Sequence, residues 1–198
     1  MGQQQEPRRD FPPTGTAEPY AGFEGAVGRT MARSESWWPP RPTPPDDAPD
    51  VVVVLCDDMG FSDLGCFGSE IDTPNLDRLA AEGLRFANFH VTPMCSPSRA
   101  TMLTGLTSQL AGVGHVCHSD PGFPGYAAQL ADDAATLPEV LRDQHGYTTL
   151  MAGKWHLAKD SDLSDAGPRH SWPLQKGYDR YYGFLDGFTN FHQPVGLV

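Results

Sequence analysis

The pattern of hydrophobic and polar positions changes character near residue 50. Residues 1–49 are rich in Pro, Gly, Glu and Arg and show no period, and six prolines between positions 39 and 49 oppose both helix and strand pairing. They predict an extended leader that contacts the rest of the chain through Trp37 and Trp38. From Val51 the run "VVVVLC" is continuous and β-branched, which is typical of a strand buried on both faces. A folded domain is therefore predicted over residues 50–198.

Beyond this strand, helical and extended patterns alternate. Helices are predicted at residues 73–83, 96–105 and 136–146, each opened by Thr or Ser, with proline in the first turn, and closed by glycine. The first pattern places Leu76, Leu79, Ala80 and Leu84 on one face. Further strands are predicted at residues 85–92 and 147–153. This order favours an α/β architecture in which helices flank a mostly parallel, mixed central sheet.

Composition narrows the class of partner. The formal net charge of -11 argues against nucleic acid or an acidic membrane surface as a partner. The four cysteines are far apart and form no CxxC pair, which indicates reduced thiols, and no stretch has the apolar length of a secretory signal or a membrane span. A cytoplasmic location is expected.

Candidate chemistry lies just after the predicted strands, where ligands of open α/β sheets bind. Asp57 and Asp58 follow the first strand and offer hard oxygen ligands for a divalent cation, although two solvated turn aspartates would look the same. After the strand at 147–153 come Lys154 and His156, which would share one side of an extended segment and could bind an anion and move a proton. On their own, such residues are also common at solvated strand ends.

Cys95 follows the strand predicted at residues 85–92 and precedes a helix start, where free backbone N–H groups favour an anion and would lower the pKa of a thiol. Arg99, in the first turn, can direct its guanidinium to an oxyanion or to residue 95. A buried structural cysteine with a surface arginine is an equal alternative at this point.

Other candidate motifs are weaker. His115, Cys117 and His118 match no standard zinc spacing. The remaining histidines, at positions 90, 145, 170 and 192, are interpreted as structural or surface residues, and the glycine-rich loops do not have the form of a phosphate loop.

Taken together, the motifs resemble a known family. The stretch "CSPSRATMLTG", Cys95 to Gly105, is similar to the CxPxR signature of the type I sulfatases, in the alkaline-phosphatase-like superfamily. The likeness continues upstream through "DDMGFSDLG" and downstream through "AGKWHL", and it covers roughly residues 50 to 190. It implies the α/β sulfatase fold and leaves the leader outside it.

The resemblance also implies a mechanism. Cys95 would be oxidised to formylglycine by a separate generating enzyme that reads Cys95, Pro97 and Arg99. The hydrated aldehyde carries two hydroxyls, one to attack sulfur and one whose deprotonation then releases sulfate. Asp57, Asp58 and the modified Cys95 would bind the metal, usually Ca²⁺ and alternatively Mg²⁺.

The remaining site residues take their roles from the same resemblance. Arg99 would steady the formylglycine, Lys154 would bridge it to the sulfate, and His156 would act as the base.

The expected function is hydrolysis of small-molecule sulfate monoesters, of the arylsulfatase type. The alternatives are a phosphonate monoester or phosphodiester hydrolase of the same superfamily, or a non-catalytic truncated remnant. Family members take a second metal-binding pair from later in a longer chain, so residues 50–198 are expected to be the N-terminal part of a catalytic domain that is incomplete at its C-terminus.

Overall fold

The computed structural model describes residues 22–190 and 192–198, and the chain divides into two compact units, Met1–Arg41 and Pro42–Val198. The first unit contains a short 3₁₀ helix, Met31–Arg33, enclosed by an antiparallel bridge between Ala26 and Glu35. The ring of Phe23 packs edge-on against Trp37, with 5.7 Å between ring centroids. Local contacts therefore give the described part of the leader some structure, while its predicted contact with the domain stays a prediction.

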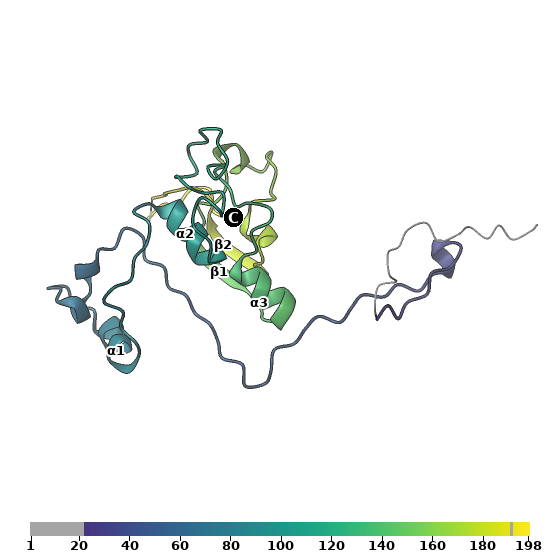
Figure 1. Cartoon of the computed structure of the whole chain (residues 1–198), viewed down its shortest axis with the longest axis horizontal. Coiled ribbons are helices and arrows are strands. Elements are labelled where there is room, and N and C mark those ends of the chain that lie inside the picture. Colours follow the sequence, from purple (N-terminus) through teal and green to yellow (C-terminus); the bar gives the residue numbers. More distant parts are fainter. Residues whose placement is uncertain (1–21, 191) are drawn as a thin grey trace, which may run out of the picture. The chain divides into compact units, whose positions relative to one another are not determined.

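The second unit is built around two parallel strands (Figure 1). β1 (Leu150–Lys154) pairs with β2 (Arg180–Phe184), so that Leu150 lies opposite Arg180 and Lys154 opposite Phe184. Three α-helices precede them: α1 (Pro74–Glu82), α2 (Cys95–Thr104) and α3 (Leu137–His145). Short 3₁₀ helices lie at Phe61–Asp63, Gly65–Phe67, Asp160–Asp162 and Pro173–Gln175.

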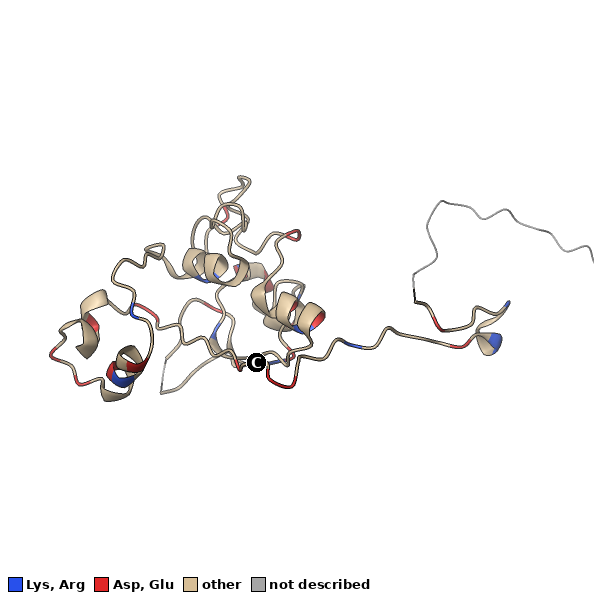
Figure 2. Ribbon diagram, turned by 60° about the horizontal axis from the view of Figure 1, so that its bottom comes forward, with Lys and Arg blue, Asp and Glu red and all other residues tan. Residues whose placement is uncertain are grey.

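All three predicted helices are present, and the local chemistry explains their ends. α3 begins with a capping box in which Thr136 and Glu139 bond each other's backbone N–H, and it ends at Gly146 in the left-handed conformation. In α1 the hydroxyl of Thr73 instead donates to Asp77 and accepts the N–H of Gly65. Acidic and basic positions are interspersed on both α1 and α3 (Figure 2), which suits helices with one face toward solvent.

The predicted cap of α2, Ser96, is wrong by two residues. The helix begins at Cys95 with Met94 as its N-cap, because the hydroxyl of Ser96 is buried and accepts the N–H of Cys117, 3.2 Å away. Pro97 still lies in the first turn, and Gly105 closes the helix with φ 67°. The half-turn shift places the side chain of Cys95 on the helix rather than before it.

Only one of the three predicted strands is present in the described residues. β1 confirms the strand predicted at residues 147–153, shifted to 150–154, and β2 was not predicted. Residues 51–56 and 85–92 are not strands and lie exposed, with Val52 83% and Phe89 75% accessible. A strand buried on both faces needs neighbours to supply ladder hydrogen bonds and cover. The described residues form no backbone ladder with either segment and leave most of both exposed.

Segment 51–56 is nevertheless aligned with β1. The hydroxyl of Tyr147 donates to the carbonyl oxygen of Pro49 at 3.1 Å, and the ammonium of Lys154 bonds Asp57 at 2.8 Å. These contacts join the two ends of segment 51–56 to the two ends of the stretch that contains β1. The two stretches therefore run in the same direction, although no backbone ladder joins them.

The hydrophobic core lies between α2 and the residues that follow β1. Ala100 and Leu103 of α2 are buried with Trp155 and Leu157, and the indole N–H of Trp155 donates to the carbonyl of Ser171 at 2.8 Å. Within residues 22–190 and 192–198, no helix combines the length and apolar character needed to cross a membrane.

Candidate active site

The first residue of α2 is Cys95, and hydrogen bonds within the preceding turn fix its place. The hydroxyls of Thr92 and Ser98 lie 2.7 Å apart, and that of Ser98 also donates to the carbonyl of Thr92. Cys95 is partly exposed at this helix N-terminus, where unpaired N–H groups face an approaching anion. The sequence predicted the cysteine just before a helix start, and the structure places it as the first residue of that helix.

The end of β1 brings Lys154 and His156 toward α2. Backbone hydrogen bonds to the residues at the end of β2 continue past β1, because the N–H groups of Trp155 and His156 donate to the carbonyls of Phe184 and Leu185. Trp155, which lies between Lys154 and His156 in the sequence, is buried in the hydrophobic core. His156, however, is not extended: its φ of 55° is in the left-handed region, a strained conformation for a residue that is not glycine.

The closest contact across the site joins Cys95 to His156. The sulfur of Cys95 lies 3.1 Å from Nδ1 of His156, although 61 positions separate the two residues in sequence. Burial, with the charges of Lys154, His118 and Arg99, lowers the pKa of His156 to about 4. The imidazole is therefore neutral at neutral pH and can accept a proton.

Arg99 is buried and ties the two halves of the site together. Its guanidinium donates to the carbonyl oxygen of Lys154 at 2.6 Å, and a second nitrogen lies 3.6 Å from Asp57. The ammonium of Lys154 bonds the other oxygen of Asp57 at 2.8 Å. Partial burial acts to raise the pKa of Asp57, but the bond from Lys154 and the two positive charges outweigh it and lower the pKa.

Asp58 is next in the chain, with a φ of 53°. It lines, with Asp57, Cys95 and Arg99, one end of a groove of about 800 Å³ whose other walls are mostly apolar side chains from residues 54–92. The structure thus brings the six predicted site residues together. Four of them, Asp57, Asp58, Cys95 and Arg99, line the same groove. Lys154 joins them through its bond to Asp57, and His156 through its contact with Cys95.

The three predicted metal ligands do not form a coordination shell in this arrangement. Among the residues that the structure describes, no cluster of three or more His, Cys, Asp or Glu side chains is placed to hold a metal ion. Asp57 directs both carboxylate oxygens to cationic side chains. Metal binding by Asp57, Asp58 and Cys95 stays a prediction from the resemblance.

Sequence reasoning missed the surroundings of His156. The ring of His118 lies 4.7 Å from that of His156, between centroids, and its Nδ1 contacts Asp160 at 2.9 Å. His118 was weighed only as part of a weak soft-metal motif, and Cys117 of the same motif is a buried core residue whose pKa burial raises to about 12. The spacing of residues in "GHVCHSD" does not indicate that His118 contacts His156, which is 38 positions away in the sequence.

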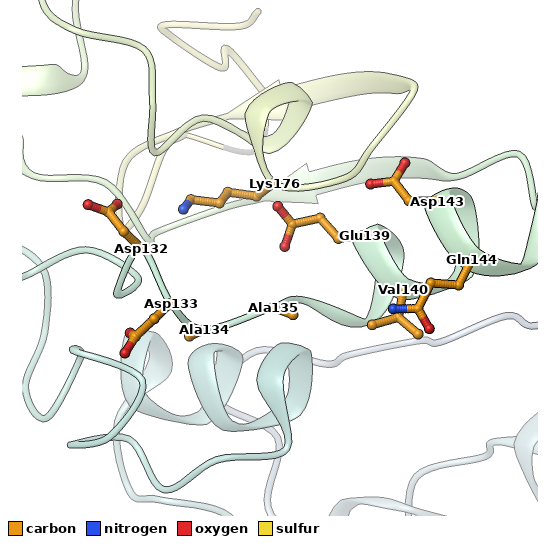
Figure 3. Close-up of a pocket in the computed structure, with 9 residues that line it drawn as sticks. All are labelled: Asp132, Asp133, Ala134, Ala135, Glu139, Val140, Asp143, Gln144 and Lys176. Atoms are coloured by element: carbon orange, nitrogen blue, oxygen red, sulfur yellow. The ribbon is translucent and has the colours of Figure 1, made fainter. Parts of the chain in front are cut away.

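A second hollow of about 320 Å³ lies away from these residues (Figure 3). Four acidic residues, Asp132, Asp133, Glu139 and Asp143, line it together with Lys176, which lies between Asp132 and Glu139 in Figure 3. Glu139 is engaged in the capping box of α3. None of the predicted site residues lines this hollow.

The lowered pKa of His156 predicts how stability depends on pH. The unfolded imidazole binds a proton below about pH 6.5, whereas the folded one does so only near pH 4. The free energy of unfolding should therefore fall as the pH is lowered from 6.5 to 4, by up to roughly 3 kcal/mol from this group, and level off for it below pH 4. Urea unfolding between pH 7 and pH 4 measures the slope.

His156→Gln should lose that part of the slope, whereas His170→Gln, which removes a surface imidazole bonded to Gln129, should keep it. An equal slope in wild type and His156→Gln would contradict a neutral, buried His156.

Comparison with known proteins agrees with this geometry. The sequence matches the Sulfatase family over residues 49–195. It is 38% identical to an arylsulfatase of Klebsiella aerogenes over 77% of this chain and 32% of that protein. Human arylsulfatase A is 41% identical over 68% of this chain and 25% of its own length.

An uncharacterised sulfatase of Schizosaccharomyces pombe is 40% identical over 74% of this chain and 30% of its own length. The chain thus spans about a third or less of these relatives.

Solved structures show the same likeness. The crystal structure of Ps i-CgsB superposes with a TM-score of 0.56 and 34% identity, over 68% of this chain and 27% of that one. The sulfatase PsFucS1 from Pseudoalteromonas sp. superposes with a TM-score of 0.52 and 26% identity, over 69% of this chain and 25% of that one. The α/β pairing of helices with a parallel sheet is therefore part of the sulfatase fold, and the chain belongs to the sulfatase family.

Proposed function

We propose that the protein hydrolyses sulfate monoesters, of the arylsulfatase type, at the site formed by Cys95, Arg99, Lys154 and His156. One observation carries the proposal: residues from two motifs far apart in sequence meet at the N-terminus of α2, with Cys95 3.1 Å from His156 and Arg99 2.6 Å from the backbone of Lys154. Membership in the family supports the reaction class.

Conversion of Cys95 to formylglycine fits its position. Cys95 is partly exposed, lies at a helix N-terminus and lines the large groove. As a hydrated aldehyde, this residue supplies one hydroxyl as a nucleophile toward sulfur and a second for the release of sulfate. An unmodified thiol would be less suited to act as a thiolate here, because the neutral His156 does not provide an imidazolium partner.

The generating enzyme would have to act before α2 packs. Of the residues in its recognition motif, Pro97 is fully buried and Arg99 is 8% exposed in the folded chain. A separate enzyme cannot read these side chains without unfolding the helix from its core. We therefore expect conversion during synthesis and little conversion of the purified, folded protein.

The chain's own residues divide the remaining work. Arg99 and Lys154 both pair with Asp57, so these two cations and one carboxylate leave a net positive charge in a protein of net charge -11. Such charge stabilises a sulfate group as its oxygens gain charge. The N-terminus of α2 adds a favourable field for the same anion. His156, neutral and 3.1 Å from the side chain of residue 95, is placed to take a proton from it.

A divalent cation is expected from the family, and Asp57 and Asp58 offer the oxygen ligands that Ca²⁺ or Mg²⁺ prefers. When bound in such a site, a cation supplies Lewis-acid activation. Because Asp57 is paired with Lys154 and Arg99 in this chain, we assign the cation no step.

Calcium titration tests whether Asp57 is held by its ion pairs with Lys154 and Arg99. Isothermal calorimetry of the purified chain with Ca²⁺ should show no tight binding, since a cation would have to displace Lys154 from the carboxylate of Asp57. Lys154→Met frees that carboxylate and should strengthen binding at least about tenfold, the order of a lost like-charge neighbour. Tight binding by the wild-type chain would contradict the ion-paired arrangement.

Turnover separates the reaction classes. The chain, produced together with the generating enzyme, is assayed with an aryl sulfate and an aryl phosphonate monoester, and faster hydrolysis of the sulfate is expected. A strong preference for the phosphonate would replace the proposed reaction by that of the phosphonate hydrolases. Failure to turn over either ester, in protein whose Cys95 is fully converted, would favour a non-catalytic remnant.

A further inference from the structure

We propose that His118 is a positioning residue that, with Asp160, Asp186 and Gly187, holds the imidazole of His156 against the side chain of residue 95. The inference rests on the proposed function only in taking Cys95 and His156 as the reactive pair. Neither the sequence motifs nor the comparisons assign a role to these four residues.

The ring of His156 has few other supports. Its Nδ1 faces the sulfur of Cys95, while its buried Nε2 has no hydrogen-bond partner. The backbone is fixed by the bond to Leu185, but rotation about the side-chain torsions is limited only by what packs on the ring. The ring of His118, 4.7 Å away and tilted by 43°, packs on it.

His118 is itself held from two sides. Its Nδ1 lies 2.9 Å from the carboxylate of Asp160, and its Nε2 lies 3.7 Å from that of Asp186. Asp160 opens the 3₁₀ helix after β1, and Asp186 follows β2, so the two strands that carry the site also carry the groups that orient His118. The edge of Phe188 lies beside the same ring, with 6.3 Å between centroids.

Gly187 explains why the two rings can approach each other. A Cβ at this position would lie 2.5 Å from Nε2 of His118 and 2.8 Å from Nε2 of His156, closer than Cβ atoms come to other atoms. Because Gly187 has no side chain, the imidazoles of His118 and His156 can both pack against its Cα. Any larger residue must push at least one ring away.

The test uses the unmodified chain and the alkylation rate of Cys95 with iodoacetamide, followed by mass spectrometry. With its proton on Nδ1, the neutral ring of His156 donates a hydrogen bond to the sulfur of Cys95 and favours its reactive form, so His156→Ala should slow alkylation of Cys95. His118→Ala and Gly187→Ala should also slow it, by at least about threefold, the lower range of coupling between residues in contact. In the His118→Ala/His156→Ala double variant, loss of His118 should add nothing.

Internal and matched controls accompany each variant. Cys56 is exposed and should keep its rate, and Cys117 is buried and should stay unreactive while the chain is folded. His170→Ala removes an imidazole remote from Cys95 and should leave its rate unchanged. If His118→Ala makes Cys117 reactive, Asp160→Asn replaces it, since this variant keeps the His118 ring and weakens only its anchor.

The proposal is overturned if Cys95 reacts at the wild-type rate in these variants, or if the effect of His118→Ala is as large without His156 as with it. The proposed function can fail separately. A chain whose Cys95 is never converted to formylglycine would defeat sulfate hydrolysis while leaving the measured coupling between His118 and His156 intact.

Discussion

Cys95→Ala is expected to abolish hydrolysis of an aryl sulfate, lowering kcat/KM by at least about a thousandfold, which is the order seen when a nucleophile is removed. The reason is chemical, because alanine cannot be converted to the aldehyde whose hydrate provides both the attacking and the releasing hydroxyl. Cys95→Ser should be as inactive in turnover, since a serine has one hydroxyl and no second one to release sulfate.

The matched control is Cys56→Ala, which removes an exposed thiol from the same groove. It should keep wild-type kcat/KM, because the Cys56 thiol forms no hydrogen bond with Cys95, Arg99, Lys154 or His156 in the described structure. Activities are compared on protein produced with the generating enzyme and matched for fold by circular dichroism. If Cys95→Ser kept a substantial part of the activity, hydrolysis would not require formylglycine, and the proposed mechanism would be contradicted.

Gly183→Ala is expected to cause the largest loss of stability, roughly 3 kcal/mol or more. A Cβ at this position would collide with the backbone carbonyl of Gly153, its partner across the parallel pair, and would meet the hydroxyl of Tyr181. That hydroxyl is half-buried and bonds the carbonyl of Gly153 at 2.9 Å, so it cannot move aside without losing this partner.

Gly153→Ala is the matched control for this variant. Its φ of 106° strains any side chain, but a Cβ there meets open space, so the expected cost is only about 1–2 kcal/mol. Urea unfolding measures both. Because Lys154 follows Gly153 directly, Gly183→Ala should also displace Lys154 and lower activity. Equal destabilisation by the two variants would show that strain, rather than the collision, dominates.

Helices could be predicted because their signals are local. A capping residue, a proline in the first turn or a closing glycine affects only the few residues next to it. The helices α1, α2 and α3 begin and end close to such residues, which include Pro74, Gly105 and the pair Thr136 and Glu139. The two-residue error at the cap of α2 has a long-range cause: the hydroxyl of Ser96 bonds Cys117 instead of capping the helix.

Strands depend on partners, which a sequence pattern does not identify. The β-branched run at 51–54 has the composition of a buried strand, yet without a paired neighbour among the described residues it stays exposed. β2 contains aromatic residues and Gly183. The sequence does not indicate that Gly183 must lack a side chain, because the reason is its close approach to Gly153 on the paired strand.

The candidate site divides in the same way. Cys95, Arg99, Lys154 and His156 were predicted because each belongs to a motif, and the structure brings them together. Asp160 and Asp186 belong to no motif, and His118 was considered only in a weak soft-metal pattern. All three approach His156 only through the tertiary fold. The guanidinium of Arg99 likewise bonds Lys154 and Asp57 rather than residue 95, which depends on where β1 ends.

The most direct test of the central claim is the mass of the tryptic peptide from Phe86 to Arg99, taken from chain produced together with a formylglycine-generating enzyme. We predict a peptide lightened by exchange of the cysteine sulfur for an aldehyde oxygen, reactive with a hydrazide probe, and absent when the same enzyme is added to the folded, purified chain. A thiol at Cys95 that remains fully alkylatable after co-production would contradict the account.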